Sequence, residues 1–251
     1  MIEIKNLSFS YSKNKKVLNN VNLTIKTGSF VTLLGPNGNG KTTLLKCIDN
    51  LLSYKEGQIL INNKDLKEYK RNELSKLIGY VPQVLEFSDM SVFDTILLGR
   101  IPYIRLDATK KDYEIVNNLI YKLNLQDVAL RNVNELSGGE RQKVAIARLL
   151  ASEAKILLFD EPTSNLDIKN QIDAMNIIKD ISKDEEITTI ISIHDISLAL
   201  KYGENFILMK DGEIVSSGDK SIINSQTLKN IFGVDVDIIN INEQNVIVFK
   251  E

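Results

Sequence analysis

The stretch from Phe30 to Thr42, FVTLLGPNGNGKT, decides the fold of this chain. Its first five residues form an apolar run, as expected for a strand that is buried on both faces. Gly35, four further residues and then Gly40-Lys41-Thr42 match the phosphate-binding P-loop pattern. The helical stretch Lys41–Leu51 follows, so the pattern has the strand before it and the helix after it that a P-loop requires. The sequence therefore predicts an α/β fold with a nucleotide phosphate site between these two elements.

The P-loop offers three kinds of phosphate or metal ligand. Its glycines allow a close approach of the backbone, so that N–H groups and the positive end of the helix can cradle the β- and γ-phosphates. Lys41 adds a mobile positive charge, and the hydroxyl of Thr42 is placed to ligate Mg²⁺. The residues that we assign to the nucleotide in this segment are Gly35, Pro36, Asn37, Gly38, Asn39, Gly40, Lys41, Thr42 and Thr43.

A second glycine motif, LSGGERQ, covers residues 136–142. Ser137 and Glu140 have the spacing of a capping box, which predicts a helix over Arg141–Ala151. The capping box does not explain the pair Gly138-Gly139. Because a helix N-terminus with two glycines and a serine hydroxyl is an anion site, we expect this motif to bind a phosphate as well.

Three further candidates stand just after predicted strands. The apolar run Ile156–Phe159 ends in Asp160-Glu161, and ligands of open α/β sheets bind outside the carboxyl ends of the strands. His194, the only histidine, follows the apolar run Thr188–Ile193. Gln83 follows a short apolar strand, at the entry of a helical region. We expect His194 to emerge on the same sheet edge as Asp160-Glu161.

Together, these motifs resemble the ATP-binding cassette (ABC) ATPase family over nearly the whole chain. The resemblance implies that Asp160, in the Walker B position, holds Mg²⁺ through a water and that Glu161 polarises the attacking water. It also identifies His194 with the switch histidine that bonds the γ-phosphate, and Gln83 with the glutamine that senses Mg²⁺ and the attacking water. Tyr11, ending the first strand, is similar to the aromatic residue that stacks on adenine. The implied cofactors are ATP and Mg²⁺, the metal lying near Thr42, Gln83 and Asp160.

The same resemblance gives the second glycine motif its partner. In the family, this motif contacts the γ-phosphate held by the P-loop of another subunit, which assigns Ser137, Gly138 and Gly139 to the nucleotide. Ser164–Asp167 resembles the D-loop that links the two sites, so Asp167 is assigned with them. Because one chain carries one of each half-site, the resemblance implies a homodimer with two complete sites. Asn39 stands where the family more often has a small residue, and we interpret it as variation.

Net charge, apolar runs and cysteine content limit the partners and the compartment that this chain can have. The 251 residues include 31 Lys and Arg against 33 Asp and Glu, a net charge of −2, which argues against a nucleic-acid partner held by bulk electrostatics. No apolar run approaches the roughly 20 residues that cross a bilayer, and the N-terminus lacks the apolar core of a signal peptide. Cys47, the single cysteine, excludes an intramolecular disulfide and fits a reducing compartment. We therefore expect a cytoplasmic protein, and the resemblance to ABC ATPases implies that it is peripheral on the inner face of the cell membrane.

The remaining patterns predict one domain over residues 1–251, an α/β P-loop NTPase fold of the RecA-like type. A mostly parallel core carries an antiparallel edge layer, an inserted helical subdomain at about 85–150 and a short β tail at about 234–250. The polar link 12–16 joins the first two strands, and Asp211-Gly212 signals a hairpin turn. The expected strands are Ile2–Tyr11, Val17–Lys26, Gln58–Ile61, Leu77–Val81, Thr188–Ile193, Phe206–Met209 and Glu213–Ser216, and the expected helices include Tyr113–Leu123 and Asn170–Ser182.

One segment favours a subgroup of the family. Leu98–Tyr103 resembles the Gly-Arg-x-Pro segment of cassettes that drive uptake of iron–siderophore, haem and cobalamin. This resemblance implies the ATPase subunit of an importer, which works with a transmembrane permease and indirectly with an extracytoplasmic binding protein. Zinc and manganese importers are the nearest alternative, and a separate exporter cassette also stays open. Soluble ABC proteins of DNA repair or translation usually carry two cassettes or a long coiled-coil insertion, which this chain lacks.

The helical region lies between Gln83 and the LSGGERQ motif, so both of its ends touch the nucleotide. A region tied in this way can rotate as a rigid body when the γ-phosphate arrives or leaves. We expect a short permease helix to dock beside Gln83, around Glu86, Met90 and Gly99–Tyr103, with Arg100 on the docking surface.

Overall fold

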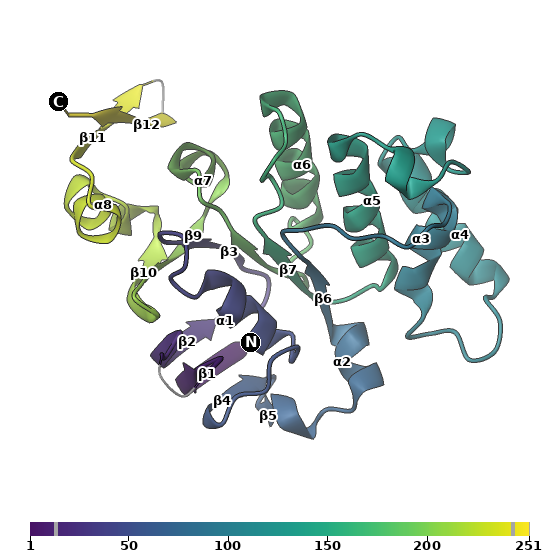
Figure 1. Ribbon diagram of the computed structural model, residues 1–251, viewed down its shortest axis with the longest axis horizontal. Helices are drawn as coiled ribbons and strands as arrows, with labels where there is room; N and C mark the ends of the chain where they lie inside the picture. The colour runs from purple at the N-terminus through teal and green to yellow at the C-terminus, as the bar shows by residue number, and fades with distance from the viewer. Residues whose placement is uncertain (13–14, 242–243, 251) are drawn as a thin grey trace. The chain divides into compact units, whose positions relative to one another are not determined.

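The computed structural model describes residues 1–12, 15–241 and 244–250, which fall into two compact units. Unit 1 comprises residues 1–69 and 188–251, and unit 2 comprises residues 70–187. Figure 1 shows the helices and strands of both units and labels most of them. The single domain over residues 1–251 stays a prediction, and each unit is described by itself.

Unit 1 contains the predicted antiparallel layer. Its sheet has the order β2-β1-β4-β5, and β1 pairs antiparallel with both β2 and β4. Along β2, every second or third side chain is buried, as expected for a sheet with one covered face. Residues 13 and 14 of the predicted polar link lie outside the described residues. The strands are β1 (Ile2–Phe9), β2 (Leu18–Ile25), β4 (Glu56–Ile61) and β5 (Lys64–Asp65).

Unit 1 also holds three parallel strands and the P-loop helix. Strand β3 (Phe30–Leu34) lies between β8 (Thr188–Ser192) and β9 (Asn205–Lys210), parallel to both. Every residue of β3 and β8 is buried, which explains their apolar runs. Strand β10 (Glu213–Asp219) runs antiparallel to β9. Helix α1 (Lys41–Ile48) is three residues shorter than predicted.

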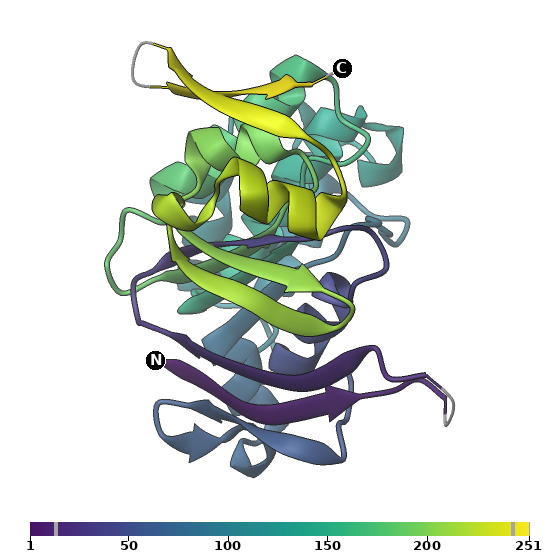
Figure 2. The ribbon, with the colours of Figure 1, turned by 90° about the vertical axis from the view of Figure 1, so that its left-hand side faces the viewer.

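The hairpin β9–β10 turns at Asp211 and Gly212, as the sequence predicts. Their φ angles are 50° and 80°, the left-handed pair that a two-residue hairpin turn requires. Figure 2 shows this hairpin above the antiparallel layer, with helix α8 and a last pair of strands above it. The last pair, β11 (Val236–Ile241) and β12 (Gln244–Phe249), is antiparallel and confirms the predicted tail strands. The short helices α7 (Ile196–Tyr202) and α8 (Ser225–Phe232) were not expected from sequence.

Unit 2 combines two parallel strands with a helical region. Strand β6 (Ile78–Val81) pairs with β7 (Ile156–Asp160). Helix α5 packs against α3, α4 and α6, and Val92, Val116, Ile120 and Val144 lie in one buried cluster among them. The helices are α2 (Arg71–Leu77), α3 (Val92–Leu97), α4 (Lys110–Lys122), α5 (Gly138–Ala151) and α6 (Ile168–Ile181), with 3₁₀ turns at Leu98–Arg100, Gln126–Val128 and Val133–Glu135.

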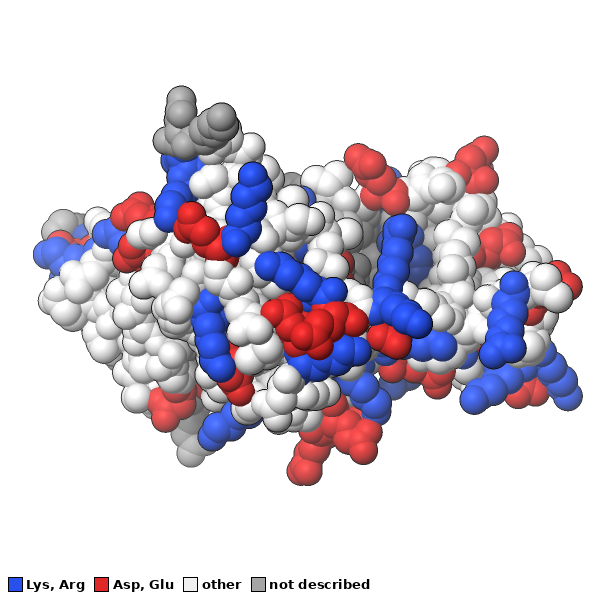
Figure 3. Space-filling view, turned by 90° about the horizontal axis from the view of Figure 1, so that it is seen from below, with Lys and Arg blue, Asp and Glu red and all other residues white. Residues whose placement is uncertain are grey.

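Within the described residues, no helix is both long enough and apolar enough to cross a bilayer. The longest, α5 and α6, have 14 residues each, which span about 21 Å against a hydrocarbon core of about 30 Å. On the face shown in Figure 3, Lys and Arg side chains are interspersed with Asp and Glu. Cys47 is fully buried, and burial raises the pKa of its thiol to about 12, as expected for a core residue without redox chemistry.

Candidate nucleotide site

The P-loop of unit 1 follows β3 and is held closely by the backbone of neighbouring segments. A Cβ atom added at Gly35 would lie 2.3 Å from the carbonyl oxygen of Met209, and one at Gly40 would lie 2.8 Å from that of Val17. Gly40 also has a φ of 94°, which side chains rarely tolerate. Glycine is therefore required at both positions by this protein's own packing.

Lys41 begins α1 and is 5% exposed. Its ammonium donates to the carbonyl oxygens of Gly35 and Pro36, at 2.7 and 3.1 Å. The loop thus surrounds the positive charge of Lys41 at the N-terminal, positive end of helix α1. Both charges attract the negative charge of a phosphate group. Thr42, half-buried, stands next to Lys41 in the first turn.

Asn39 has a role that the interpretation as variation missed. Its side-chain amide donates to the carbonyl oxygen of Asn37, at 3.2 Å, and its side-chain oxygen accepts from the N–H of Asp211. The P-loop is therefore tied to the β9–β10 turn. The sequence did indicate that position 39 is unusual, because it has an amide side chain where the family more often has a small residue. Its partner Asp211 lies 172 positions away, too far to be predicted from the sequence.

Tyr11 and His194 belong to unit 1 as well. The hydroxyl of Tyr11 lies 3.2 Å from the hydroxyl of Thr43 on α1, and its ring, 62% exposed, meets Phe9 edge-on. An exposed ring is thus fixed beside the first turn of α1. In the parallel pair of β3 and β8, Leu33 pairs with Ser192. His194, exposed and two residues beyond this pair, therefore leaves the sheet at the edge where the P-loop begins.

In unit 2, the ends of β6 and β7 bring Gln83 and Glu161 together. Val81 pairs with Phe159, so the two side chains, each two residues further on, emerge at the same edge. The amide of Gln83 donates to the Glu161 carboxylate at 2.8 Å. Glu161 has a φ of 48°, and the hydroxyl of Ser164 donates to its carbonyl oxygen at 2.9 Å.

Asp160 is only 1% exposed, at the end of β7. The hydroxyl of Tyr80 donates to one of its carboxylate oxygens at 3.1 Å. A buried carboxylate is costly unless it is hydrogen-bonded, so Tyr80 both stabilises and orients it. Sequence reasoning did not find Tyr80, since nothing in the strand β6 marks it as a partner of Asp160.

The LSGGERQ motif opens α5 with the predicted capping box. Ser137 donates to the Glu140 carboxylate through its hydroxyl at 2.6 Å and its backbone N–H at 2.9 Å, and these bonds lower the pKa of Glu140. Helix α5 already begins at Gly138, three residues earlier than predicted. The two glycines therefore lie in its first turn, where N–H groups have no partner within the helix.

Gly139 is required by packing against α6. A Cβ atom there would lie 2.3 Å from the side-chain oxygen of Asn170, whereas one at Gly138 would make only ordinary contacts. Asn170 is fixed by Asp167, the N-cap of α6, which accepts from its backbone N–H at 2.8 Å and from its side-chain amide at 2.9 Å. Asp167 therefore holds α6 against the glycine motif, in addition to any contact with nucleotide.

Arg100 does not lie on a surface, so the expected place of this residue was wrong. It is 2% exposed and donates to Asp112 at 2.9 Å, to Glu153 at 2.7 Å and to the carbonyl oxygen of Ala151 at 2.7 Å. Its guanidinium also covers the ring of Tyr103, 4.1 Å from the centroid. Arg100 therefore connects its own segment to helix α4 and to the end of helix α5 in the interior of unit 2.

The comparisons with known proteins agree with this arrangement of motifs. The ABC transporter family model matches residues 18–164, more than half of the chain. An uncharacterised ABC transporter ATP-binding protein of Methanocaldococcus jannaschii is 48% identical over 248 residues, which cover 99% of this chain and 97% of the relative. A probable iron chelatin transport ATP-binding protein of Helicobacter pylori is 38% identical over 218 residues, 85% of each chain.

Two solved structures are similar in fold. A proposed metal-chelate type ABC transporter in an inward-facing conformation matches with a TM-score of 0.84 and 28% identity, over 99% of this chain and 98% of that one. A dimeric ATP-binding cassette in a post-hydrolysis state, bound to ADP and Pi, matches with a TM-score of 0.77 and 32% identity, over 87% and 98%. The chain therefore belongs to the ABC transporter family, in which it is an ATP-binding cassette that hydrolyses ATP.

Proposed function

We propose that this cassette powers the uptake of a metal chelate, of the iron–siderophore, haem or cobalamin type, through a transmembrane permease. The observation that carries the proposal is the 38% identity to the iron chelatin transport protein over 85% of the chain. The segment Leu98–Tyr103 supports the same subgroup. In this proposal, a homodimer of cassettes works on the inner face of the membrane, and an extracytoplasmic binding protein delivers the substrate.

In this function, Glu161 polarises the water that attacks the γ-phosphate. Gln83, which donates to its carboxylate, fixes the direction of that side chain, and Lys41 supplies positive charge to the phosphates. The hydroxyl of Thr42, the carboxylate of Asp160 and the amide oxygen of Gln83 are the oxygen donors that Mg²⁺ prefers. When bound, Mg²⁺ neutralises charge on the β- and γ-phosphates.

The remaining assignments follow the family pattern. Tyr11 would stack on adenine, and His194 would bond the γ-phosphate. Ser137, Gly138 and Gly139 would meet the γ-phosphate held by the P-loop of the second subunit, with Asp167 beside them. Since each chain carries one P-loop and one glycine motif, two chains form two complete sites.

The dimer can be tested with a variant that blocks the proposed trans contact. With hydrolysis prevented by Glu161→Gln, ATP should drive dimerisation, because a ligand that binds the dimer more tightly than the monomer stabilises the dimer by mass action. Adding Ser137→Arg should abolish this dimer through its bulk and its charge near the partner subunit's Lys41. Light scattering with and without ATP measures the outcome.

The matched control for Ser137→Arg is Ser91→Arg. Ser91 caps α3 as Ser137 caps α5, and it hydrogen-bonds Asp94 with the same spacing. Both variants lose a capping interaction, which is worth about 1 kcal/mol, but only Ser137 lies in the glycine motif. An ATP-dependent dimer that survives Ser137→Arg would refute the trans site.

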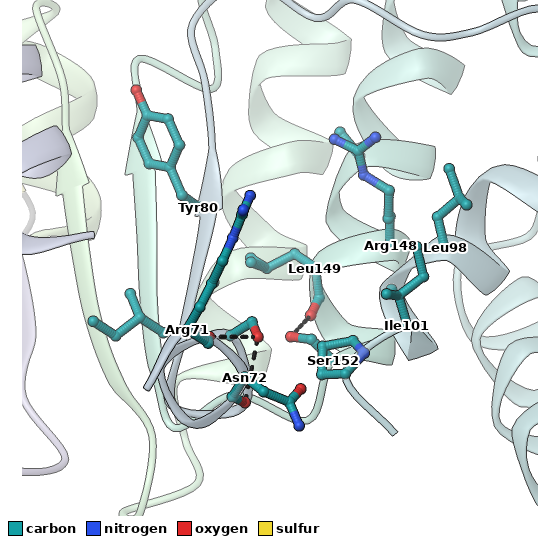
Figure 4. Close-up of a pocket in the computed structure, with 14 residues that line it drawn as sticks. Arg71, Asn72, Tyr80, Leu98, Ile101, Arg148, Leu149 and Ser152 are labelled. Atoms are coloured by element: carbon teal, nitrogen blue, oxygen red, sulfur yellow. Dashed lines mark hydrogen bonds between the residues drawn. The ribbon is translucent and has the colours of Figure 1, made fainter. Parts of the chain in front are cut away.

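For the permease, we propose a docking surface in unit 2 beside the buried Arg100. A cavity of about 640 Å³ opens between α2, β6, α5 and the segment after α3. Figure 4 shows Leu98 and Ile101 on that segment and Arg71 and Arg148 reaching in from α2 and α5. Ile101 is 59% exposed. An exposed apolar side chain at the rim of a groove suits an amphipathic helix laid into it.

Ile101→Glu should therefore uncouple transport. Burial of a charged carboxylate beneath an apolar helix face would oppose docking, while basal ATP hydrolysis by the isolated cassette should stay within about twofold. The measurement is uptake of an iron–siderophore complex by the assembled transporter in vesicles. Leu130→Glu is the control, since Leu130 is 88% exposed and lies outside the cavity. Full uptake with Ile101→Glu would refute the docking surface, and uptake of zinc or manganese by the wild type instead would refute the metal-chelate substrate.

A further inference from the structure

The ring of Tyr11 stands at the surface of unit 1 with little to hold it. Tyr11 is 62% exposed, and its ring is nearly perpendicular to that of Phe9, with the centroids 4.9 Å apart. Its hydroxyl lies 3.2 Å from the hydroxyl of Thr43, which is the hydrogen bond that the described part of the chain gives it. An exposed side chain exchanges rotamers within nanoseconds unless a contact holds it. The orientation of this ring therefore depends on Thr43.

Thr43 is suited to fix a mobile ring. It is 5% exposed and belongs to the first turn of α1, two positions after Lys41. Its branched Cβ leaves the side chain few rotamers in a helix. A buried hydroxyl is costly without a hydrogen bond, and the partner of this hydroxyl is Tyr11. The bond thus ties a surface ring to a rigid position on the helix that begins at the P-loop.

This bond relates the two ends of a bound nucleotide to one helix. Lys41 begins α1 at the phosphates, and Thr43 holds the ring that would receive the base. A tyrosine side chain has three staggered χ1 rotamers, so a ring without the bond would be in any one of them for about a third of the time. The apparent affinity of a ligand falls by the fraction of the protein that is competent to bind it, so the bond contributes about threefold to affinity.

We infer that Thr43 is a positioning residue for the base of the nucleotide, and that its hydroxyl orients the ring of Tyr11 instead of contacting a phosphate. The backbone N–H of Thr43 lies in the first turn of α1, where it has no partner within the helix and stays available to the phosphates. The pair favours a ligand that carries both a planar base and a phosphate chain. This inference rests on the proposed stacking of Tyr11 on adenine.

The test is a double-mutant cycle of Tyr11→Phe and Thr43→Val, which each remove one hydroxyl and keep the size of the side chain. Each variant should bind ATP about threefold more weakly, and the double variant no more weakly than either one. All three should bind tripolyphosphate, which has no base, as tightly as the wild type. Calorimetry in the presence of Mg²⁺ measures both affinities.

Three results would overturn the inference. One is a wild-type affinity for ATP in Tyr11→Phe or Thr43→Val. Another is additive effects, which would weaken ATP binding by the double variant about ninefold. The third is weaker binding of tripolyphosphate by Thr43→Val, which would show that the hydroxyl contacts a phosphate directly.

The matched controls lose the same groups elsewhere. Tyr113→Phe removes the hydroxyl of a tyrosine that is 43% exposed and stacked on Phe93. Thr95→Val removes a buried hydroxyl that donates to the carbonyl oxygen of Ser91 at 2.8 Å. Both should bind ATP as the wild type does, and so should Thr43→Ser, which keeps its hydroxyl. A threefold loss in Thr43→Ser or in the controls would overturn the inference, since the effect would not depend on this hydrogen bond.

Tyr11→Ala separates this inference from the stacking on which it rests. Loss of the ring should weaken ATP binding by roughly 5- to 150-fold, because stacking of a base on an aromatic side chain is worth about 1–3 kcal/mol. A wild-type affinity for ATP in Tyr11→Ala would refute the stacking itself. The expected loss in Tyr11→Ala together with an additive cycle would refute the role of Thr43 alone.

Discussion

A Glu161→Gln variant is expected to bind ATP normally and to hydrolyse it about 10²- to 10⁴-fold more slowly than the wild type. Glutamine keeps the shape of the side chain and an oxygen that can accept from Gln83, but it has no negative charge with which to polarise water. The backbone conformation is unaffected, since both residues carry a Cβ. Calorimetry measures ATP affinity, and release of phosphate in the presence of Mg²⁺ measures turnover.

The control for lost charge is Glu114→Gln. Glu114 lies on α4, and its side chain is 62% exposed beside Lys110, so its carboxylate has no part in the proposed chemistry. This variant should hydrolyse ATP at the wild-type rate. If Glu161→Gln did so too, the water-polarising group would have to be sought elsewhere at the ends of β6 and β7.

The second large effect is expected on stability. Arg100→Met should lower the free energy of unfolding by about 3 kcal/mol, because the buried carboxylate of Asp112 would keep its hydrogen bonds from Thr109 but lose its counter-charge. The side chains of Arg100 and Asp112 are 3% and 5% exposed. Urea denaturation measures the change. Lys110→Met is the control, since Lys110 pairs with Glu114 at 3.8 Å on an exposed face and should change stability by less than about 1 kcal/mol.

The carboxylate of Asp112 also contributes to the acid side of the stability curve. Hydrogen bonds from Thr109 and then from Arg100 lower the pKa of Asp112 from 3.8 to about 2. As the pH falls, the unfolded chain therefore takes up the proton first. The stability that Asp112 contributes is complete above about pH 4 and is lost as the pH falls through 2. A loss of less than about 1 kcal/mol in Arg100→Met at neutral pH would contradict a buried ion pair of this strength.

Local patterns predicted the elements that rest on local physics. The runs at β3 and β8 are buried at every residue. A strand that is buried on both faces needs apolar side chains at successive positions, and such a run can be recognised in the sequence. Asp211-Gly212 predicted its turn because few residues tolerate two left-handed φ angles in succession. The capping box of Ser137 and Glu140 is equally local. Among the site residues, Gln83 and Glu161 meet because their strands are parallel and in register.

The features that could not be predicted from the sequence depend on contacts between distant residues or on elements too short to show a pattern. Arg100 in its Gly-Arg-x-Pro setting reads as an exposed cation, and its burial follows from Asp112 and Glu153, which lie 12 and 53 residues away. Helices α7 and α8, with seven and eight residues, are too short to show a helical period.

The contacts behind the P-loop have a consequence for the thermodynamics of nucleotide binding. The carbonyls of Met209 and Val17 and the N–H of Asp211 fix the loop from one side. A loop that folding has already ordered loses little conformational entropy when a ligand arrives, so affinity gains from this preorganisation. Part of the affinity for ATP is therefore encoded in the β9–β10 hairpin, 172 positions along the chain from Asn39.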